Sequence, residues 1–534
     1  MSSPLSDNPV PTAPSTRATI LVDHPDPKTF CLEDIQGDIY PTFPKDFEWF
    51  FFFTIKDATA FKTNLAEFIP LIATASSTRE KLQEIAVAKL NRKPEDPKPR
   101  IPLRLYQMAL TAKAFKPLDL GLTSKLADQH WANGQLAHAK KLGDRPKHTD
   151  TEYTPDWEPV WLKNELHGVI LVATHCEAEC KLAEDEIRKT FPSSIDIVNI
   201  VKGRVRDERH NEHFGSVVIS FYMYLDIYLI RCYPRFKDGI SQPAIEGLVK
   251  ARDDRMKCKP GVILIGHDGE PNPMKRPAWA KNSAMMAFRK LQQFVPEFNT
   301  FLENNPTELE GLTKEQAIEL TGAKLIGRFK SGCPIDLSDR IDDPVLGADP
   351  CRNNDFDYQK PPPGQERCPY VAHTRKMAPR FTTVPELQAV LPESLIMRAA
   401  IPYGEELDEV EKGAKQTLKD RGLAFVSYQS FLEAGFVRQQ VVWANNPEFP
   451  PIEREEKRPA SGFDPIIGNS SKGEEGPREV TGINPKALSK VMSLPDFVVA
   501  RGGEYFWVPS MTALGLISKG QLKDEKPISA NQRA

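Results

Sequence analysis

The sequence has little of what marks a nucleic-acid-binding or membrane-spanning protein. Its 534 residues carry a formal net charge of −3, so no basic excess points to nucleic acid. The longest apolar run, residues 217–230, is too short to span a bilayer and contains Asp226. The first residues show neither a basic n-region nor an apolar h-region. We therefore expect a cytoplasmic protein with no membrane partner, or a secreted one if the true start of the gene lies elsewhere.

The eight cysteines are scattered, and none of them forms a CxxC pair. The sequence therefore neither indicates a structural zinc site nor demands an oxidising compartment. Cys176 and Cys180 are four residues apart in a helix-like stretch. This spacing favours two thiols on one helix face over a metal or redox pair.

What the sequence does have is length and proline. A chain of 534 residues is too long for one ordinary core, and 47 prolines predict long irregular connections. Aromatic, β-branched or continuous apolar runs predict strands at residues 49–55, 103–110, 166–174, 261–266, 285–291 and 422–428. Helices are predicted at residues 57–68, 177–190, 295–304, 313–322 and 431–443. Strands alternating with helices in two halves indicate an α+β protein with two antiparallel sheets.

These patterns also suggest where the parts begin and end. We expect a disordered leader at 1–28, an N-terminal domain at 29–215, an anomalous insertion at 216–235, a C-terminal domain at 236–524 and a flexible tail at 525–534.

Three short segments carry residues suited to redox chemistry, but each is weak by itself. Asp238 precedes a glycine, and Asp-Gly is a common turn dipeptide. His373 is a single histidine, more often a surface or core residue than a ligand, although imidazole is a common axial donor to haem iron. Arg398 alone would be an ordinary ion-pair partner. Only their combination is informative.

Taken together, these segments resemble the dye-decolorizing peroxidase family in its fungal form. Asp238-Gly239, after Phe236-Lys237, matches the end of the family's Gly-x-x-Asp-Gly motif. Further similar blocks stand at residues 32–39, 327–332, 368–380 and 502–506, so the resemblance spans about residues 31–520. It implies two ferredoxin-like domains, each an antiparallel β-sheet with peripheral helices, with haem in the C-terminal domain.

The resemblance also implies roles for individual residues. Asp238 and Arg398 would be the distal catalytic acid and arginine, and His373 the axial ligand of the haem iron. The other residues implied to contact the cofactor are Arg375, Arg380, Ile240, Gln242, Leu423 and Phe425. The two arginines suit haem propionates, because a guanidinium pairs with a carboxylate in a fork geometry.

Aromatic residues could carry electrons to dyes too bulky for the pocket. Tyr403 matches a surface-radical position of fungal relatives, with Trp443 and Trp507 as looser candidates. For all three, the sequence favours core or interface aromatics over a relay role. Asp464 could orient His373 through its second ring nitrogen, as carboxylates near metal sites do.

The sequence departs from the family pattern in two places. Met377-Ala378-Pro379-Arg380 replaces the usual Thr-Asn-Pro-Arg. More seriously, residues 216–235 split the acid motif, since relatives read Phe-Gly-Phe-Lys-Asp-Gly continuously. The inserted residues are β-branched and aromatic, unlike a loop, and we interpret them as a retained intron in the gene model.

The expected function is therefore that of a haem peroxidase. One haem b per chain would use hydrogen peroxide to oxidise dyes, phenols and other aromatic reductants. Two alternatives are a haem-binding protein impaired by the insertion and a haem-handling protein of the same fold. A homodimer is possible, since family members often dimerise.

Overall fold

The computed structural model describes most of the chain. The described residues are 30–91, 101–121, 123–147, 152–163, 165–205, 240–249, 256–272, 274, 276–359, 364–380, 384–451, 461–470 and 478–522. Asp238 and the insertion at 216–235 lie outside them, and the predicted domain boundaries stay a prediction.

The N-terminal half forms a four-stranded antiparallel sheet in the order β2-β3-β1-β4. Its strands are β1 (Phe47–Ile55), β2 (Arg104–Leu110), β3 (Gly168–Thr174) and β4 (Ile195–Arg204). Alternate side chains of β1 point to opposite faces. Phe50 and Phe52 join one buried cluster, and Trp49, Phe51 and Phe53 join another, which also contains residues of α1 (Ala58–Phe68) and α6 (Glu177–Thr190).

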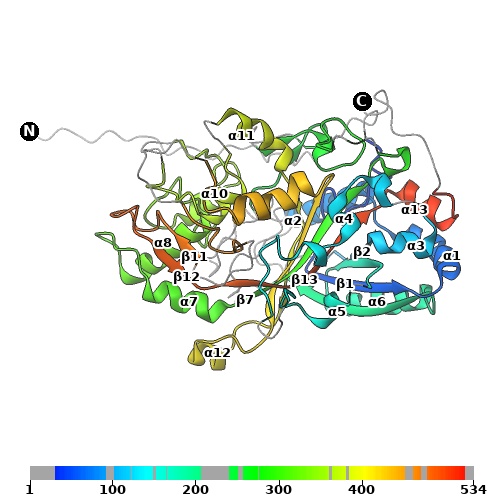
Figure 1. Cartoon of the computed structure of the whole chain (residues 1–534), viewed down its shortest axis with the longest axis horizontal. Helices are drawn as coiled ribbons and strands as arrows, with labels where there is room; N and C mark the ends of the chain where they lie inside the picture. Colours follow the sequence, from blue (N-terminus) through cyan, green and yellow to red (C-terminus); the bar gives the residue numbers. More distant parts are fainter. Residues whose placement is uncertain are drawn as a thin grey trace, which may run out of the picture.

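The C-terminal half forms a second antiparallel sheet in the order β13-β7-β10-β9. Its strands are β7 (Ala284–Gln293), β8 (Met397–Arg398), β9 (Ile401–Gly404), β10 (Arg421–Gln429) and β13 (Val498–Val508). The two short strands pair with different parts of the same edge of β10: β9 with residues 421–424 and β8 with residues 427–428. Two antiparallel sheets with peripheral helices confirm the predicted fold class (Figure 1).

The two sheets join at both edges. Trp507 of β13 pairs with Leu110 of β2, and Gly203 of β4 pairs with Tyr403 of β9. Eight strands therefore close into a ring, and one buried cluster draws side chains from all of them. Its centre holds Phe52 against Phe288, with ring centroids 4.9 Å apart. Burying each such side chain contributes about 1.5–3 kcal/mol, so this cluster ties the halves together.

The remaining elements surround these sheets. The other helices are α2 (Ala75–Leu90), α3 (Phe115–Leu118), α4 (Gln129–Asn133), α5 (Pro159–Leu162), α7 (Val295–Asn304), α8 (Lys314–Ile326), α9 (Pro344–Ala348), α10 (His373–Met377), α11 (Pro385–Val390), α12 (Glu409–Ala414), α13 (Met511–Ser518) and the π-helix η10 (Glu433–Ala444). Short strands pair as β5 (Ala244–Ile245) with β6 (Lys257–Cys258), and β11 (Arg478–Val480) with β12 (Met492–Leu494). Figure 1 shows α1, α3 and α6 at one end of the long axis and α7 and α8 at the other.

Two local predictions are wrong. The strand predicted at 261–266 is a buried turn that begins with a short 3-10 helix (Pro260–Val262). The amide of Gly261 donates to the carbonyl of Asp268, and a Cβ on Gly261 would meet the amide nitrogen of Glu270 at 2.2 Å, so the backbone folds back on itself. Cys176 is the N-cap residue of α6 rather than a helical residue, so it does not share a helix face with Cys180. Among the described residues, no helix is long and apolar enough to cross a membrane.

Candidate active site

A large cavity lies against the outer face of the C-terminal sheet. Residues on β7 and β10 alternate, so Phe288 and Val426 point into the ring while Arg289, Leu423 and Phe425 point into the cavity. The empty space, including the part open to solvent, is about 1180 Å³. The outward-facing side chains of these two strands therefore form one wall of the cavity.

Helix α10 forms another wall of the cavity, and a glycine places it there. Helix α8 ends at Gly327, whose φ of +98° is in the left-handed region. A Cβ at Gly327 would stand 1.9 Å from Oγ1 of Thr374 in α10. Only glycine therefore allows α8 to end this close to α10, whose first residue is His373.

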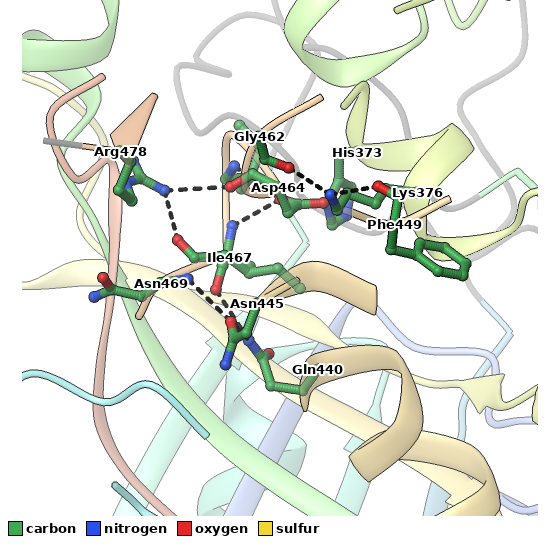
Figure 2. A network of polar contacts seen from close by, with 12 residues as sticks. His373, Lys376, Gln440, Asn445, Phe449, Gly462, Asp464, Ile467, Asn469 and Arg478 are labelled. Carbon is green, nitrogen blue, oxygen red and sulfur yellow. Dashed lines mark hydrogen bonds and ion pairs between the residues drawn. The ribbon is translucent and has the colours of Figure 1, made fainter. Parts of the chain in front are cut away.

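His373 lines the cavity and is paired with a buried carboxylate. Its Nδ1 lies 2.9 Å from Oδ2 of Asp464, whose side chain is fully buried (Figure 2). The other oxygen of Asp464 accepts hydrogen bonds from the amides of Ile466 and Ile467. Burial alone would raise the pKa of Asp464, but His373 and these amides lower it below its usual value. Asp464 is therefore a fixed anion behind the imidazole.

Lys376 fixes the same wall from one helical turn further on. Its buried ammonium donates to three backbone carbonyls, at 2.9, 2.8 and 2.5 Å, and Figure 2 shows it beside the segment that carries Asp464. These carbonyls belong to Asn446, Phe449 and Gly462. The lysine thereby joins α10 to the loop after η10 and to the chain just before Asp464.

Arg398 lines the cavity from β8. The side-chain amide of Gln242 receives a hydrogen bond from the Arg398 amide at 3.1 Å and donates to the Arg398 carbonyl at 2.8 Å. Gln242 thus pairs with Arg398 as a neighbouring strand would. The guanidinium itself donates to the carbonyl of Ser241 at 2.5 Å. The segment 240–243 therefore holds both the backbone and the head group of Arg398.

The cavity brings together only part of the predicted set. His373, Arg398, Leu423 and Phe425 line it, whereas Ile240, Gln242, Arg375, Arg380 and Asp464 do not. Within the segment 240–243, Ser241 and Pro243 line the cavity instead.

Arg375 and Arg380 are buried behind the cavity rather than in its lining. Arg375 donates to two backbone carbonyls, and its guanidinium stacks 4.3 Å from the ring centroid of Tyr370. Arg380 donates to two further carbonyls and, at 2.8 Å, to Oγ of Ser241. A buried guanidinium needs such acceptors. Contact of either arginine with a cofactor stays a prediction.

Sequence reasoning missed several lining residues, including Arg289, Leu291, Gln293 and Phe436. One signal was available: Arg289 and Lys290 are adjacent charged residues that directly follow the apolar run 284–288 of the same strand. Arg289 is buried and forms a bidentate pair with Asp144. A charge in such a strand requires a partner and often marks a site.

The aromatic residues predicted at the surface are buried. Tyr403 is 5% exposed and Trp443 and Trp507 are 2% and 0% exposed, so the favoured interpretation as buried aromatics is confirmed and a surface position for them is wrong. Tyr403 belongs to the cluster inside the ring and donates its hydroxyl to Asp420 at 3.0 Å. Trp443 stacks on Phe449, with ring centroids 5.1 Å apart. A relay role for these residues stays a prediction.

Comparisons with known proteins give a consistent answer. The family model described as the DyP dimeric alpha+beta barrel domain matches residues 34–207. The dye-decolorizing peroxidase of Mycena epipterygia is 35% identical over 91% of this chain and 87% of its own. AauDyP1, the dye-decolorizing peroxidase of Auricularia auricula-judae, is 36% identical over 95% of this chain and 89% of its own.

Solved structures agree with the sequence relatives. A mutant of the dye-decolorizing peroxidase from Pleurotus ostreatus superimposes with a TM-score of 0.80 at 37% identity, covering 92% of this chain and 99% of that one. A dye-decolorizing peroxidase in complex with 2,6-dimethoxyphenol superimposes with a TM-score of 0.74 at 36% identity, over 92% of this chain and 100% of that one. The chain is a peroxidase that belongs to the dye-decolorizing peroxidase family.

Proposed function

We propose that the chain binds one haem b in the cavity and uses hydrogen peroxide to oxidise dyes, phenols and other aromatic reductants. The observation that carries this proposal is a histidine held by a buried carboxylate on the wall of a large cavity that an arginine also lines. The same pairing of a metal-binding imidazole with a carboxylate recurs in metal sites, where it fixes the ring and raises its basicity.

The residues present fit a haem. Most of the lining is apolar, as a porphyrin face requires, and includes Leu291, Ile326, Leu423, Phe425 and Ile466.

The histidine fits as well. Its Nδ1 is hydrogen-bonded to Asp464, so Nε2 is the ring nitrogen that would bind the haem iron. When bound, the haem supplies the two-electron chemistry with peroxide, and the protein supplies placement and field.

Four residues of the chain would have separate roles in the reaction with peroxide. His373 would bind the iron, and Asp464 would keep its imidazole in one tautomer and orientation. Arg398 would stabilise the negative charge that develops on the departing peroxide oxygen. Asp238 would move a proton between the two peroxide oxygens, directly or through one water.

Asp238 lies outside the described residues, so its proposed role rests on the resemblance of Asp238-Gly239 to the family's acid motif. Ser241, three positions later in the sequence, lines the cavity and accepts a hydrogen bond from Arg398.

The proposed reductants rest on the chemistry of the cavity lining and on the phenol bound by a relative. A relative's structure holds 2,6-dimethoxyphenol, a small phenol, and an apolar cavity open to solvent could admit such a molecule here. Dyes too bulky to enter would give up electrons through Tyr403 or Trp443 or another buried aromatic. The predicted homodimer remains part of this proposal.

The absorption spectrum of the expressed protein, with and without codons 216–235, tests the proposal directly. We expect a Soret band and peroxide-driven bleaching of a dye. A Soret band without bleaching would identify a haem-binding protein without turnover. Failure to show any Soret band after reconstitution with haem would reject every haem function. Sequencing the cDNA decides whether the insertion is translated.

Substitutions test the assigned roles. Asp238→Asn and Arg398→Leu should each slow the reaction with peroxide by about 10²-fold or more in stopped-flow traces. His373→Ala should weaken haem retention first. Glu297→Gln, which changes a carboxylate bound to Thr417 outside the cavity lining, is the control. Traces of the first two variants that match the parent would refute the assignments.

A further inference from the structure

A buried tyrosine and a buried histidine are hydrogen-bonded beside the cavity. Tyr505 lies on β13 and is 0% exposed, and its hydroxyl is 3.1 Å from Nδ1 of His138. His138 ends the short 3-10 helix η4 (Leu136–His138). Neither residue was predicted for the site, and neither lines the cavity.

Aromatic rings connect this pair to the cavity. Phe436 of η10 lines the cavity, and its ring centroid is 6.1 Å from that of Tyr505. Phe425, also in the lining, is 6.0 Å from Phe436 by the same measure. Tyr505 is therefore one aromatic ring away from a molecule bound in the cavity.

The phenol donates and the imidazole accepts. Burial, and then the neighbouring His130, lower the pKa of His138 to about 3, so the imidazole is neutral in working buffers. A fully buried phenol hydroxyl needs an acceptor, and Nδ1 of His138 is the one the described residues offer. Nδ1 is therefore unprotonated and the proton of His138 is on Nε2. Within the described part of the chain, Nε2 has no hydrogen-bond partner.

A second histidine and a glutamate lead from the pair to the surface. The ring of His130 stacks on that of His138, with centroids 4.3 Å apart and planes 26° apart. Nε2 of His130 pairs with Oε2 of Glu433, whose side chain is 47% exposed. This carboxylate favours positive charge on His138, so the charge of a proton that arrives there is partly compensated.

We propose that Tyr505 is an internal redox-active tyrosine and that His138 is its proton acceptor. The inference rests on the proposed haem function. Tyr505 gives one electron to haem that peroxide has oxidised. Its O–H bond breaks, the proton forms an N–H bond at Nδ1 of His138, and a neutral phenoxyl radical remains. When an aromatic reductant returns one electron to the phenoxyl, the proton returns from His138 to the phenol oxygen.

The weak basicity of His138 is compatible with this role, and it affects how strongly the Tyr505 radical oxidises other molecules. An oxidised phenol is a far stronger acid than a phenol, so even a weakly basic imidazole takes its proton. Because the imidazolium is disfavoured in its buried position, the proton is driven back as soon as an electron is available. Tyr505 would therefore be a strong oxidant, suited to aromatic molecules that are hard to oxidise.

Electron paramagnetic resonance of the parent protein frozen after mixing with peroxide tests the inference. We expect a tyrosyl signal that narrows when the protein carries ring-deuterated tyrosine. Tyr505→Phe should remove this signal while the Soret band and its response to peroxide remain. Tyr428→Phe is the matched control, because Tyr428 is equally buried but bonds to Asp38 inside the ring, and it should leave the signal unchanged.

His138→Gln separates proton transfer from hydrogen bonding. The glutamine keeps an acceptor near the phenol but cannot take its proton, so radical formation should slow by about 10²-fold. The solvent deuterium isotope effect of the parent on this step should be lost as well. An unchanged rate would overturn the role of His138. A normal Soret response with no tyrosyl signal, or a signal that survives Tyr505→Phe, would overturn the inference about Tyr505. A protein with no Soret band would overturn the proposed function, and this inference with it.

Discussion

Nδ1 of His373 lies 2.9 Å from Oδ2 of Asp464, and both oxygens of this buried carboxylate are hydrogen-bonded. The carboxylate is ionised at ordinary pH because the hydrogen bonds and the nearby imidazole lower its pKa despite burial. The contact fixes the orientation of the imidazole and places a negative charge behind it. An iron bound to His373 would therefore have a basic ligand, which favours its oxidised form.

Replacing Asp464 with asparagine tests this relationship. Asp464→Asn keeps a group that can accept from Nδ1 but removes the charge, so we expect haem affinity to fall by about 10–100-fold and the iron reduction potential to rise. Haem transfer to an excess of apomyoglobin measures the first and spectroelectrochemistry the second. The control is Glu411→Gln. Glu411 is also a buried carboxylate, but its partner, Arg421 of β10, does not line the cavity, so haem affinity and reduction potential should stay at the parental values. An unaltered potential in Asp464→Asn would show that the carboxylate does not act on the ligand.

The elements with dense local patterns could be predicted from the sequence. Four consecutive phenylalanines in β1 predicted a buried strand, and helix α6 has the predicted bounds, 177–190. In both, the signal lies within the segment itself, as side-chain period or propensity. The closure of the ring could not be predicted, because it depends on pairing at two edges between residues hundreds of positions apart.

The site was only partly predictable for a related reason. The resemblance pointed to His373 and Arg398, and the chemistry of metal-binding histidines pointed to Asp464, but neither pointed to Lys376 or explained how Gln242 acts. These two side chains bond to backbone groups, and backbone groups are the same in every residue, so the sequence carries no trace of such contacts.

Lys376 should stabilise the wall that carries the histidine. Lys376→Met keeps the volume of the side chain but leaves three buried carbonyls without their donor, so unfolding free energy should fall by about 2 kcal/mol or more. Haem loss should become faster, because the segment before Asp464 is released. Thermal melts and haem-transfer rates measure both.

A matched lysine serves as the control. Lys324 of α8 is also buried and donates to two backbone carbonyls, but these belong to residues 366 and 367 and not to the segments that Lys376 bonds. Lys324→Met should lower stability without a comparable change in the rate of haem loss. Equal effects of the two substitutions on haem loss would contradict a specific role for Lys376.

Gln242 should act on peroxide chemistry through Arg398. Gln242→Leu removes both hydrogen bonds to the Arg398 backbone and leaves those groups to find other partners. We expect the reaction with peroxide to slow by about tenfold, the effect of about 1.4 kcal/mol at the barrier, with an unchanged Soret band. Stopped-flow mixing with peroxide measures the rate. Gln316→Leu, which removes an amide from the N-terminal cap of α8, should react at the parental rate. A parental rate in Gln242→Leu would mean that Arg398 needs no such support.

The buried ion pair between Glu411 and Arg421 should make stability depend on pH. Both side chains are fully buried and bonded in a fork geometry. Burial alone would raise the pKa of Glu411, but Arg421 and the amides of Leu418 and Lys419 lower it from 4.5 to about 2. Because the pKa of Glu411 is lower in the folded than in the unfolded protein, the ion pair stabilises the fold fully above about pH 4.5. This stabilisation, about 3 kcal/mol, is lost as the pH falls through 2.

Denaturant unfolding of the parent and of Glu411→Gln measures this dependence. Their unfolding free energies should differ by about 3 kcal/mol at pH 6 and become similar toward pH 2. A difference that stays constant over this range would show that the pair is not the source of the pH dependence.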